Sequence, residues 1–226
     1  MKSKRITIIC GHYGSGKTTF SINYALYLRN QTSKDIYIAD LDVVNPYFRS
    51  REHFDYLKDK NIKVIGSYLP QSGADLPAVS AEVYTLFNNK NIIGIVDMGG
   101  NSAGSLSFAT FRYNVDIEET DIIFILNANR EENSTLEFAL GHFNSIESTL
   151  GLKITGIINN THLMNDTTIE DINKGELISS ELSKEKNIPV KFTCVNMDFF
   201  DNNPNIKTKY DLFLIGYDIK TVTNII

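Results

Sequence analysis

The sequence is poor in cysteine: among its 226 residues only Cys10 and Cys194 occur, and they do not form a CxxC pair. Two cysteines are too few for a disulfide framework, a structural zinc site or a cysteine-ligated iron–sulfur cluster within one chain. Long apolar runs are also missing, since no stretch approaches the roughly 18 residues of a membrane-spanning helix. The first ten residues lack the apolar core of a signal peptide. We therefore expect a protein of the reducing cytoplasm.

Basic residues are too few to outweigh the acidic ones. The chain has 22 Lys and Arg against 27 Asp and Glu, a net charge of -5 at pH 7. This balance lacks the basic footprint of a protein that tracks a phosphate backbone, so nucleic acid is disfavoured as a partner. Residues 210–226 carry Lys220 as their only base, which argues against a basic amphipathic membrane anchor.

Nothing in the sequence marks a domain boundary. No internal repeat, low-complexity linker or charge block interrupts the chain, and its hydrophobic content of 42% is that of an ordinary globular protein. We expect one domain that spans residues 1–226.

Short runs rich in β-branched residues alternate with longer stretches of helical character. Several of the short runs are apolar nearly throughout, as strands covered on both faces must be. The expected strands are 5–10, 35–40, 62–65, 92–97, 121–127, 154–159 and 188–195, and the expected helices are 19–29, 77–87, 103–113, 132–150 and 168–186. Gly175 interrupts the pattern of the last helix. The alternation predicts an α/β fold with a doubly wound, mostly parallel sheet flanked by helices, whose ligand lies beyond the carboxyl ends of the strands.

The first strand runs into the sequence GHYGSGKT at residues 11–18, which matches the phosphate-loop pattern G-x-x-x-x-G-K-[ST] between a strand and a helix. Backbone N–H groups of such a loop surround phosphates, Lys17 adds a charge for catalysis and binding, and the Thr18 hydroxyl binds Mg²⁺. The predicted nucleotide-binding residues of this segment are Gly11, His12, Tyr13, Gly14, Ser15, Gly16, Lys17, Thr18 and Thr19.

Acidic residues follow two further strands. Asp40 and Asp42 close the second strand, and we expect Asp42 to orient the attacking water while Asp40 contributes to the metal site. Asp97 ends the fourth strand and is expected to bind Mg²⁺, with the N–H of Gly100 available to the γ-phosphate. The competing interpretations are a helix cap for Asp40 or Asp42 and a simple strand-ending turn for Asp97.

The base is expected to contact Asn160, which follows the sixth strand where guanine-specific proteins carry an aspartate. Guanine offers two donors to an acceptor-only aspartate, whereas adenine offers a donor and an acceptor that match an asparagine amide. Asn160 therefore points to ATP, unless it is an ordinary turn asparagine. The segment 173–176, NKGE, looks superficially like a guanine motif but follows no strand.

Together these motifs resemble the MinD/ParA/CobQ type of P-loop ATPase, within the SIMIBI class of P-loop NTPases. The resemblance spans residues 5–195, and the segments GHYGSGKT and ADLDVVNPYFRSRE are similar to an uncharacterised ATP-binding branch of that family. It implies phosphate and Mg²⁺ binding by Lys17 and Thr18, a switch role for Asp42, a Walker B role for Asp97 and adenine contact by Asn160. The family's extra lysine, which reaches across a dimer, is His12 here.

We expect a Mg²⁺-dependent ATP-binding switch with weak ATPase activity, whose nucleotide state controls an ATP-dependent homodimer or association with an unknown protein partner. The alternative is an ATP-dependent small-molecule ligase or kinase that resembles dethiobiotin synthetase or the cobyrinate amidating enzymes. A carboxylate substrate turned over with ATP would distinguish that alternative from the switch.

Overall fold

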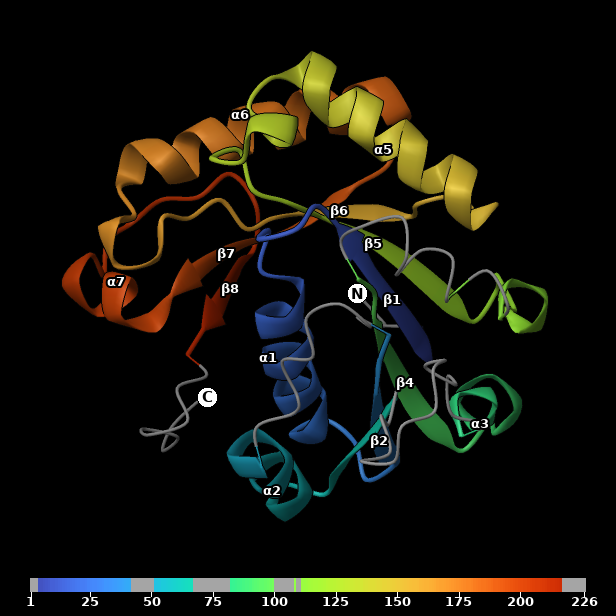
Figure 1. The fold of residues 1–226 in the computed structure, drawn as a ribbon. Helices are drawn as coiled ribbons and strands as arrows, with labels where there is room; N and C mark the ends of the chain where they lie inside the picture. The colour runs from blue at the N-terminus through green and yellow to red at the C-terminus, as the bar shows by residue number, and fades with distance from the viewer. Residues whose placement is uncertain (1–3, 42–50, 67–81, 100–107, 109–110, 217–226) are drawn as a thin grey trace, which may run out of the picture.

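A parallel β-sheet forms the centre of the molecule (Figure 1). The computed structural model describes residues 4–41, 51–66, 82–99, 108 and 111–216. The described residues form eight strands in the order β3-β2-β4-β1-β5-β6-β7-β8, and every neighbouring pair is parallel. The strands are β1 (Ile6–Gly11), β2 (Asp35–Asp40), β3 (Ile62–Gly66), β4 (Ile92–Asp97), β5 (Thr120–Leu126), β6 (Gly156–Asn159), β7 (Val190–Asn196) and β8 (Leu212–Ile215). The predicted fold class is confirmed.

Helices cover both faces of the sheet, which explains why its central strands are apolar throughout. All residues of β1 and of β5 are buried. The helices are α1 (Lys17–Arg29), α2 (Arg51–Asp59), α3 (Val83–Asn88), α5 (Leu136–Leu150), α6 (Ile169–Lys186) and α7 (Met197–Asn202). Side chains of α1 and α2 share one core with the sheet, and those of α3, α5 and α6 share the other. Figure 1 shows α5 and α6 on the opposite side of the sheet from α1.

Three of the predicted helices appear where the sequence pattern placed them, as α1, α5 and α6. Helix α6 runs uninterrupted through Gly175, which is buried in its middle. Of the predicted helix 77–87, only the part from residue 82 onward is described, and it belongs to α3. The predicted helix 103–113 falls largely outside the described residues, and its end is a 3-10 turn at Arg112–Asn114.

Strand β8 was not expected from the sequence. Residues 198–209, which are rich in turn-forming residues, contain part of α7. The next apolar residues add a parallel strand to β7, and Phe213 packs against Phe20 of α1 at a ring distance of 5.2 Å. A four-residue strand is too short to show a periodic pattern, so only its place at the sheet edge identifies it.

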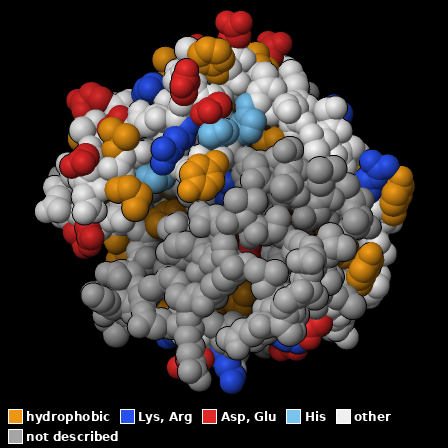
Figure 2. Space-filling model, viewed as in Figure 1, with side chains coloured by type: hydrophobic (Ala, Val, Ile, Leu, Met, Phe, Trp, Pro, Cys, Tyr) orange, Lys and Arg blue, Asp and Glu red, His pale blue; other side chains and the backbone are white. Residues whose placement is uncertain are grey.

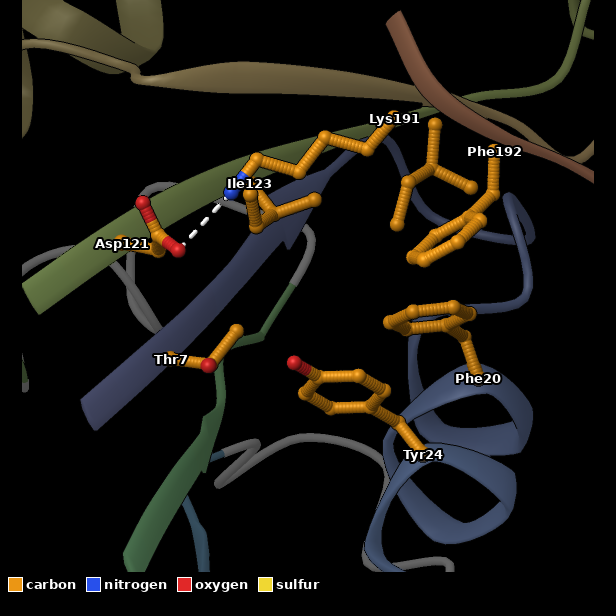
Figure 3. Close-up of a pocket in the computed structure, with 8 residues that line it drawn as sticks. Thr7, Phe20, Tyr24, Asp121, Ile123, Lys191 and Phe192 are labelled. Carbon is orange, nitrogen blue, oxygen red and sulfur yellow. Dashed lines mark hydrogen bonds and ion pairs between the residues drawn. The ribbon is translucent and has the colours of Figure 1, made fainter. Parts of the chain in front are cut away.

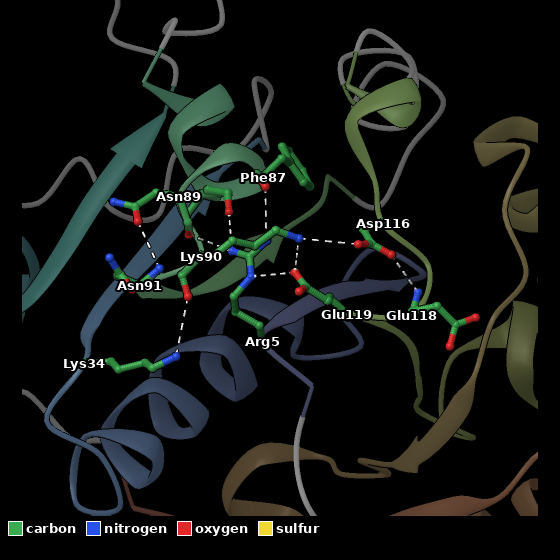
Figure 4. Close-up of polar contacts among 10 residues, drawn as sticks. Arg5, Lys34, Phe87, Asn89, Lys90, Asn91, Asp116, Glu118 and Glu119 are labelled. Atoms are coloured by element: carbon green, nitrogen blue, oxygen red, sulfur yellow. Dashed lines mark hydrogen bonds and ion pairs between the residues drawn. The ribbon is translucent and has the colours of Figure 1, made fainter.

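A polar network fastens α3 to the amino edge of the sheet (Figure 4). The Arg5 guanidinium donates to the carbonyl oxygens of Leu86 at 2.6 Å and of Phe87 and Asn89 at 3.1 Å, at the carboxyl end of the helix. Glu119 accepts from Lys90 at 2.7 Å and from Arg5 at 2.9 Å. These bonds lower the pKa of Glu119, that from Lys90 most. The network satisfies helix-end carbonyls and is therefore structural.

A second polar feature lies under α1, again toward the amino ends of the strands (Figure 3). There Lys191 and Asp121 form an ion pair at 2.8 Å beside Phe20 and Tyr24. The register between β6 and β7 shifts by one residue at Lys191, so its side chain crosses β6 above Gly156, where a Cβ would lie 2.8 Å from the lysine Cε. This small hollow lies at the edge opposite the phosphate loop and does not form part of the predicted site.

None of the helices in the described part of the chain combines the length and hydrophobicity that crossing a bilayer requires.

Candidate functional site

The predicted phosphate loop connects the end of β1 to the start of α1. Gly11 has φ +144° and Gly16, the residue before the helix, has φ +84°. A Cβ at Gly11 would lie 2.5 Å from the carbonyl oxygen of Ile125, so this position accepts only glycine. The loop therefore closes tightly over the carboxyl edge of the sheet.

The loop delivers the amino end of α1 to this edge. No acidic side chain occupies the first turn, so the free N–H groups and the positive dipole end remain available to an anion. Lys17 is 6% exposed, and its Nζ donates to the carbonyl oxygen of His12 at 2.9 Å. Thr18 and Thr19 follow in the same turn, Ser15 is fully buried and Tyr13 is 59% exposed. The predicted loop residues thus lie together around the amino end of α1.

Two distant side chains brace the outside of the loop. Arg130, beyond β5, donates from Nε to the carbonyl oxygen of Gly14 at 3.1 Å. Asn160, beyond β6, donates from Nδ2 to the carbonyl oxygen of Ser15 at 2.7 Å. Lys17, Arg130 and Asn160 thus each donate a hydrogen bond to a loop carbonyl. These bonds stabilise the loop conformation whose backbone N–H groups are predicted to bind phosphate. Arg130 is not among the predicted site residues, and its only signal in the sequence is its place in the polar run NANREEN after a buried strand.

The acidic residues lie on the other side of the loop. Asp40 of β2 and Asp97 of β4 are register partners, and Ile9 of β1 is the register partner of Asp97. Asp40 and Asp97 lie two residues after Ile38 and Ile95, which pack in the core shared with α1. Because side chains alternate along a strand, both carboxylates lie on the face that α1 covers. Asp97 is 1% exposed. Asp42 and Gly100 lie outside the described residues.

The donors at this edge suit magnesium. Thr18 supplies a hydroxyl, and Asp40 and Asp97 supply carboxylates, all of them the hard oxygen ligands that Mg²⁺ prefers. Among the described residues no group of three or more His, Cys, Asp or Glu could hold a metal ion by itself. A nucleotide-bound ion needs only one or two protein ligands, since phosphates and water complete its shell.

His12 is engaged within its own chain. Its Nδ1 lies 2.8 Å from the carbonyl oxygen of Tyr13, and its Nε2 lies 3.2 Å from Glu132, a contact that is ionic only when His12 is protonated. Its ring also meets that of His142 edge-on at 5.2 Å. Contact of His12 with a second subunit would require these interactions to break.

The other titratable groups near the loop are shielded from water. Burial, followed by the charges of His12 and Lys17, lowers the pKa of His142 to about 4. Burial and then Arg130 lower the pKa of His162. Burial raises the pKa of the Cys10 thiol to about 12, which makes it an inert core cysteine.

A buried polar network positions Asn160. Within it, Asn159 accepts from the N–H and the hydroxyl of Thr161, and Asn127 accepts from the N–H of His162. The hydroxyl of Thr161 accepts from the N–H of Ala128, so hydrogen bonds join the loops after β5 and β6.

The guanine-like segment 173–176 lies inside α6, as its position in the sequence indicated. Its Glu176 accepts from the hydroxyl of Thr193 at 2.7 Å and from the N–H of Lys209 at 2.8 Å, which anchors β7 and the chain beyond α7. This carboxylate is structural and does not contact a base.

Comparisons with known proteins agree with this architecture. No protein-family model matches the sequence, and no curated protein matches it. Solved structures do match: the cell division protein FtsY of Thermotoga maritima (TM-score 0.58, 21% identity, 84% of this chain and 61% of that one) and chloroplast FtsY of Physcomitrella patens (0.56, 17%, 85% and 58%). A third is the signal recognition particle 54 kDa protein of Aeropyrum pernix K1 in complex with GDP (0.55, 16%, 85% and 41%).

The chain spans about three fifths or less of the length of these proteins. At such identities the likeness shows the fold alone, that of a P-loop NTPase. The SIMIBI class and the MinD/ParA/CobQ branch named in the sequence analysis therefore stay predictions.

Proposed function

We propose that the protein is a Mg²⁺-dependent nucleoside triphosphate switch with slow hydrolysis. One observation carries the proposal: the glycine-rich loop is braced from outside and presents its N–H groups, with Lys17, at the amino end of α1. Thr18, Asp40 and Asp97 are the groups that would hold Mg²⁺, which supplies charge neutralisation for the β- and γ-phosphates. Lys17 holds the terminal phosphates, and Asp97 and Asp40 hold water or metal at the adjoining strand ends.

We propose ATP as the nucleotide. Asn160 is buried beside the loop and uses one N–H for Ser15, which leaves its Oδ1 and second N–H for the donor and acceptor of adenine. Isothermal titration calorimetry with Mg-ATP and Mg-GTP tests this, and tighter binding of ATP is expected. Asn160→Asp should reduce the preference. Equal or tighter binding of GTP by the wild type would overturn the adenine assignment.

GTP is the second candidate, because a structural neighbour contains a guanine nucleotide. FtsY of Elizabethkingia anophelis, solved in complex with GDP, matches 86% of this chain with a TM-score of 0.55. The same titration decides between the two nucleotides.

Hydrolysis and association complete the proposed cycle. Asp42→Ala should bind Mg-ATP and hydrolyse it much more slowly, because the attacking water loses its acceptor. Hydrolysis at the wild-type rate would assign the water to Asp40 instead.

We propose that ATP promotes a homodimer, and sedimentation of Asp42→Ala with and without Mg-ATP tests it. A dimer that His12→Ala leaves unchanged would remove His12 from the interface, and a monomer under every condition would overturn the dimer.

A further inference from the structure

The strand order separates two sides of the phosphate loop. On one side of β1 lies β4, with Asp97, followed by β2 with Asp40. On the other side lie β5 and β6, whose following loops carry Arg130 and Asn160. The metal and the terminal phosphates are expected beside the aspartates. The nucleoside should therefore lie on the other side of the loop, next to Arg130 and Asn160.

Arg130 covers Gly14 with one face of its guanidinium. A Cβ at Gly14 would lie 2.7 Å from Nη2, 2.8 Å from Cζ and 2.9 Å from Nε of Arg130. Three nearly equal distances mean that the plane, rather than its edge, faces the glycine. The bond from Nε to the Gly14 carbonyl fixes this orientation, and only glycine permits it. One face of the guanidinium is therefore occupied by the loop.

The other face is open. Arg130 is exposed, and within the described part of the chain its guanidinium has no carboxylate partner and no hydrogen bond besides that to the Gly14 carbonyl. The neighbouring Glu132 is directed to His12 instead. Beside burial, the positive charge of Arg130 lowers the pKa of His162, two residues beyond Asn160 in the sequence. His162 is also close to the loop, since a Cβ at Gly16 would lie 3.3 Å from its Nε2. In Figure 2, pale-blue histidine side chains and a blue cationic one gather in the upper part of the surface.

We propose that Arg130 is a nucleoside-binding residue, on whose open guanidinium face the purine ring of the bound nucleotide stacks. A planar cation stacks on an aromatic ring through cation–π attraction and does not distinguish adenine from guanine. Arg130 thus supplies affinity for the base, and the choice between bases falls to Asn160. This inference rests on the proposed nucleotide-binding function.

The experiment compares a nucleotide with a ligand that has no base. Binding of Mg-ATP, Mg-GTP and Mg-tripolyphosphate is measured by calorimetry for the wild type and Arg130→Ala. Loss of the stacking face should weaken both nucleotides alike, by roughly 3- to 30-fold, and leave tripolyphosphate unchanged. Arg130→Lys keeps a donor for Gly14 but no plane, so it should follow Arg130→Ala.

Lys174→Ala is the matched control, because Lys174 is a nearby surface cation whose Nζ contacts Asn129 at 3.4 Å and not the loop. It should bind all three ligands as the wild type does. Equal losses for tripolyphosphate and nucleotides in Arg130→Ala would make Arg130 a brace of the loop and overturn the inference. So would unchanged nucleotide binding. A wild type that binds neither nucleotide would overturn the proposed function as well.

Discussion

Lys17 is the side chain on which the proposed phosphate binding should depend most. Its ammonium is almost buried and already directed to a loop carbonyl, so it is oriented before a ligand arrives. A hydrogen bond to a charged group contributes about 1.5–3 kcal/mol, so Lys17→Ala should raise the Kd for Mg-ATP by roughly 10- to 150-fold. Calorimetry measures this, with the 88% exposed Lys153 replaced by Ala as the control. Equal affinities of the two variants would contradict the assignment.

His142 is expected to make the protein sensitive to mild acid. Its ring packs on His12 and Phe124, and its Nδ1 has no hydrogen-bond partner among the described residues. With the pKa lowered to about 4 in the fold and near 6.5 in the unfolded chain, protons bind the unfolded state more readily between these values. Stability should therefore fall as the pH drops from about 6.5 towards about 4.

His142→Phe keeps an aromatic ring without the titrating group, so the slope of unfolding free energy against pH should become shallower in this window. Urea unfolding over pH about 7 to about 5 measures the slope. Part of it should persist, because the pKa of His162 is lowered as well. Identical slopes for wild type and variant would exclude His142 as the source.

At the scale of the element, α6 lies close to the end of β6 because Gly175 has no side chain. A Cβ there would lie 2.1 Å from both Asn159 Oδ1 and Thr161 Oγ1, two atoms of the network that positions Asn160. This close approach explains why a residue that weakens helices occupies the middle of α6.

Gly175→Ala should destabilise the protein by about 1–3 kcal/mol, because overpacking outweighs the gain of up to about 1 kcal/mol in helix propensity. Gly141, exposed in α5 with nothing within 4 Å of its would-be Cβ, provides the matched control. Gly141→Ala should stabilise by about 0.5–1 kcal/mol. Urea unfolding of both variants checks this, and stabilisation by both would refute the close approach of α6 to β6.

For the whole molecule, a ligand held between loops from separate strands should stabilise the entire domain. A nucleotide at 100 times its Kd adds about 2.7 kcal/mol to the unfolding free energy. In a domain of this size that corresponds to a rise in Tm of about 5–10 °C. Thermal unfolding with Mg-ATP should show the rise, and Lys17→Ala should not. An unchanged wild-type Tm at saturating nucleotide would contradict binding at this site.

The parallel sheet makes such a site possible because all strands point their carboxyl ends to one edge. The phosphate loop follows β1, the aspartates end β2 and β4, and the bracing side chains follow β5 and β6. Residues from five strands therefore meet around one loop, while the amino edge carries structural ion pairs such as that between Arg5 and Glu119.

The sequence by itself determined the fold class and the place of the glycine-rich loop between β1 and α1. Both depend on local patterns: apolar runs long enough for covered strands, helical periodicity, and a contiguous GHYGSGKT segment whose glycines and lysine act within eight residues. The acids at strand ends could be predicted for the same reason, since a strand end is a local feature. The roles of these acids remain predictions, and Asp42 and Gly100 also lie outside the described residues.

Only the tertiary structure decided what surrounds the loop. Arg130 and Gly14 are 116 residues apart, and Asn160 and Ser15 are 145 apart, so no local pattern links them. Their contacts follow from the order β1-β5-β6, which a sequence does not display. For the same reason the sequence could not predict strand β8 or the close approach of α6 to the end of β6 at Gly175. Packing against distant residues outweighs the weak local preferences of a four-residue strand and a helical glycine.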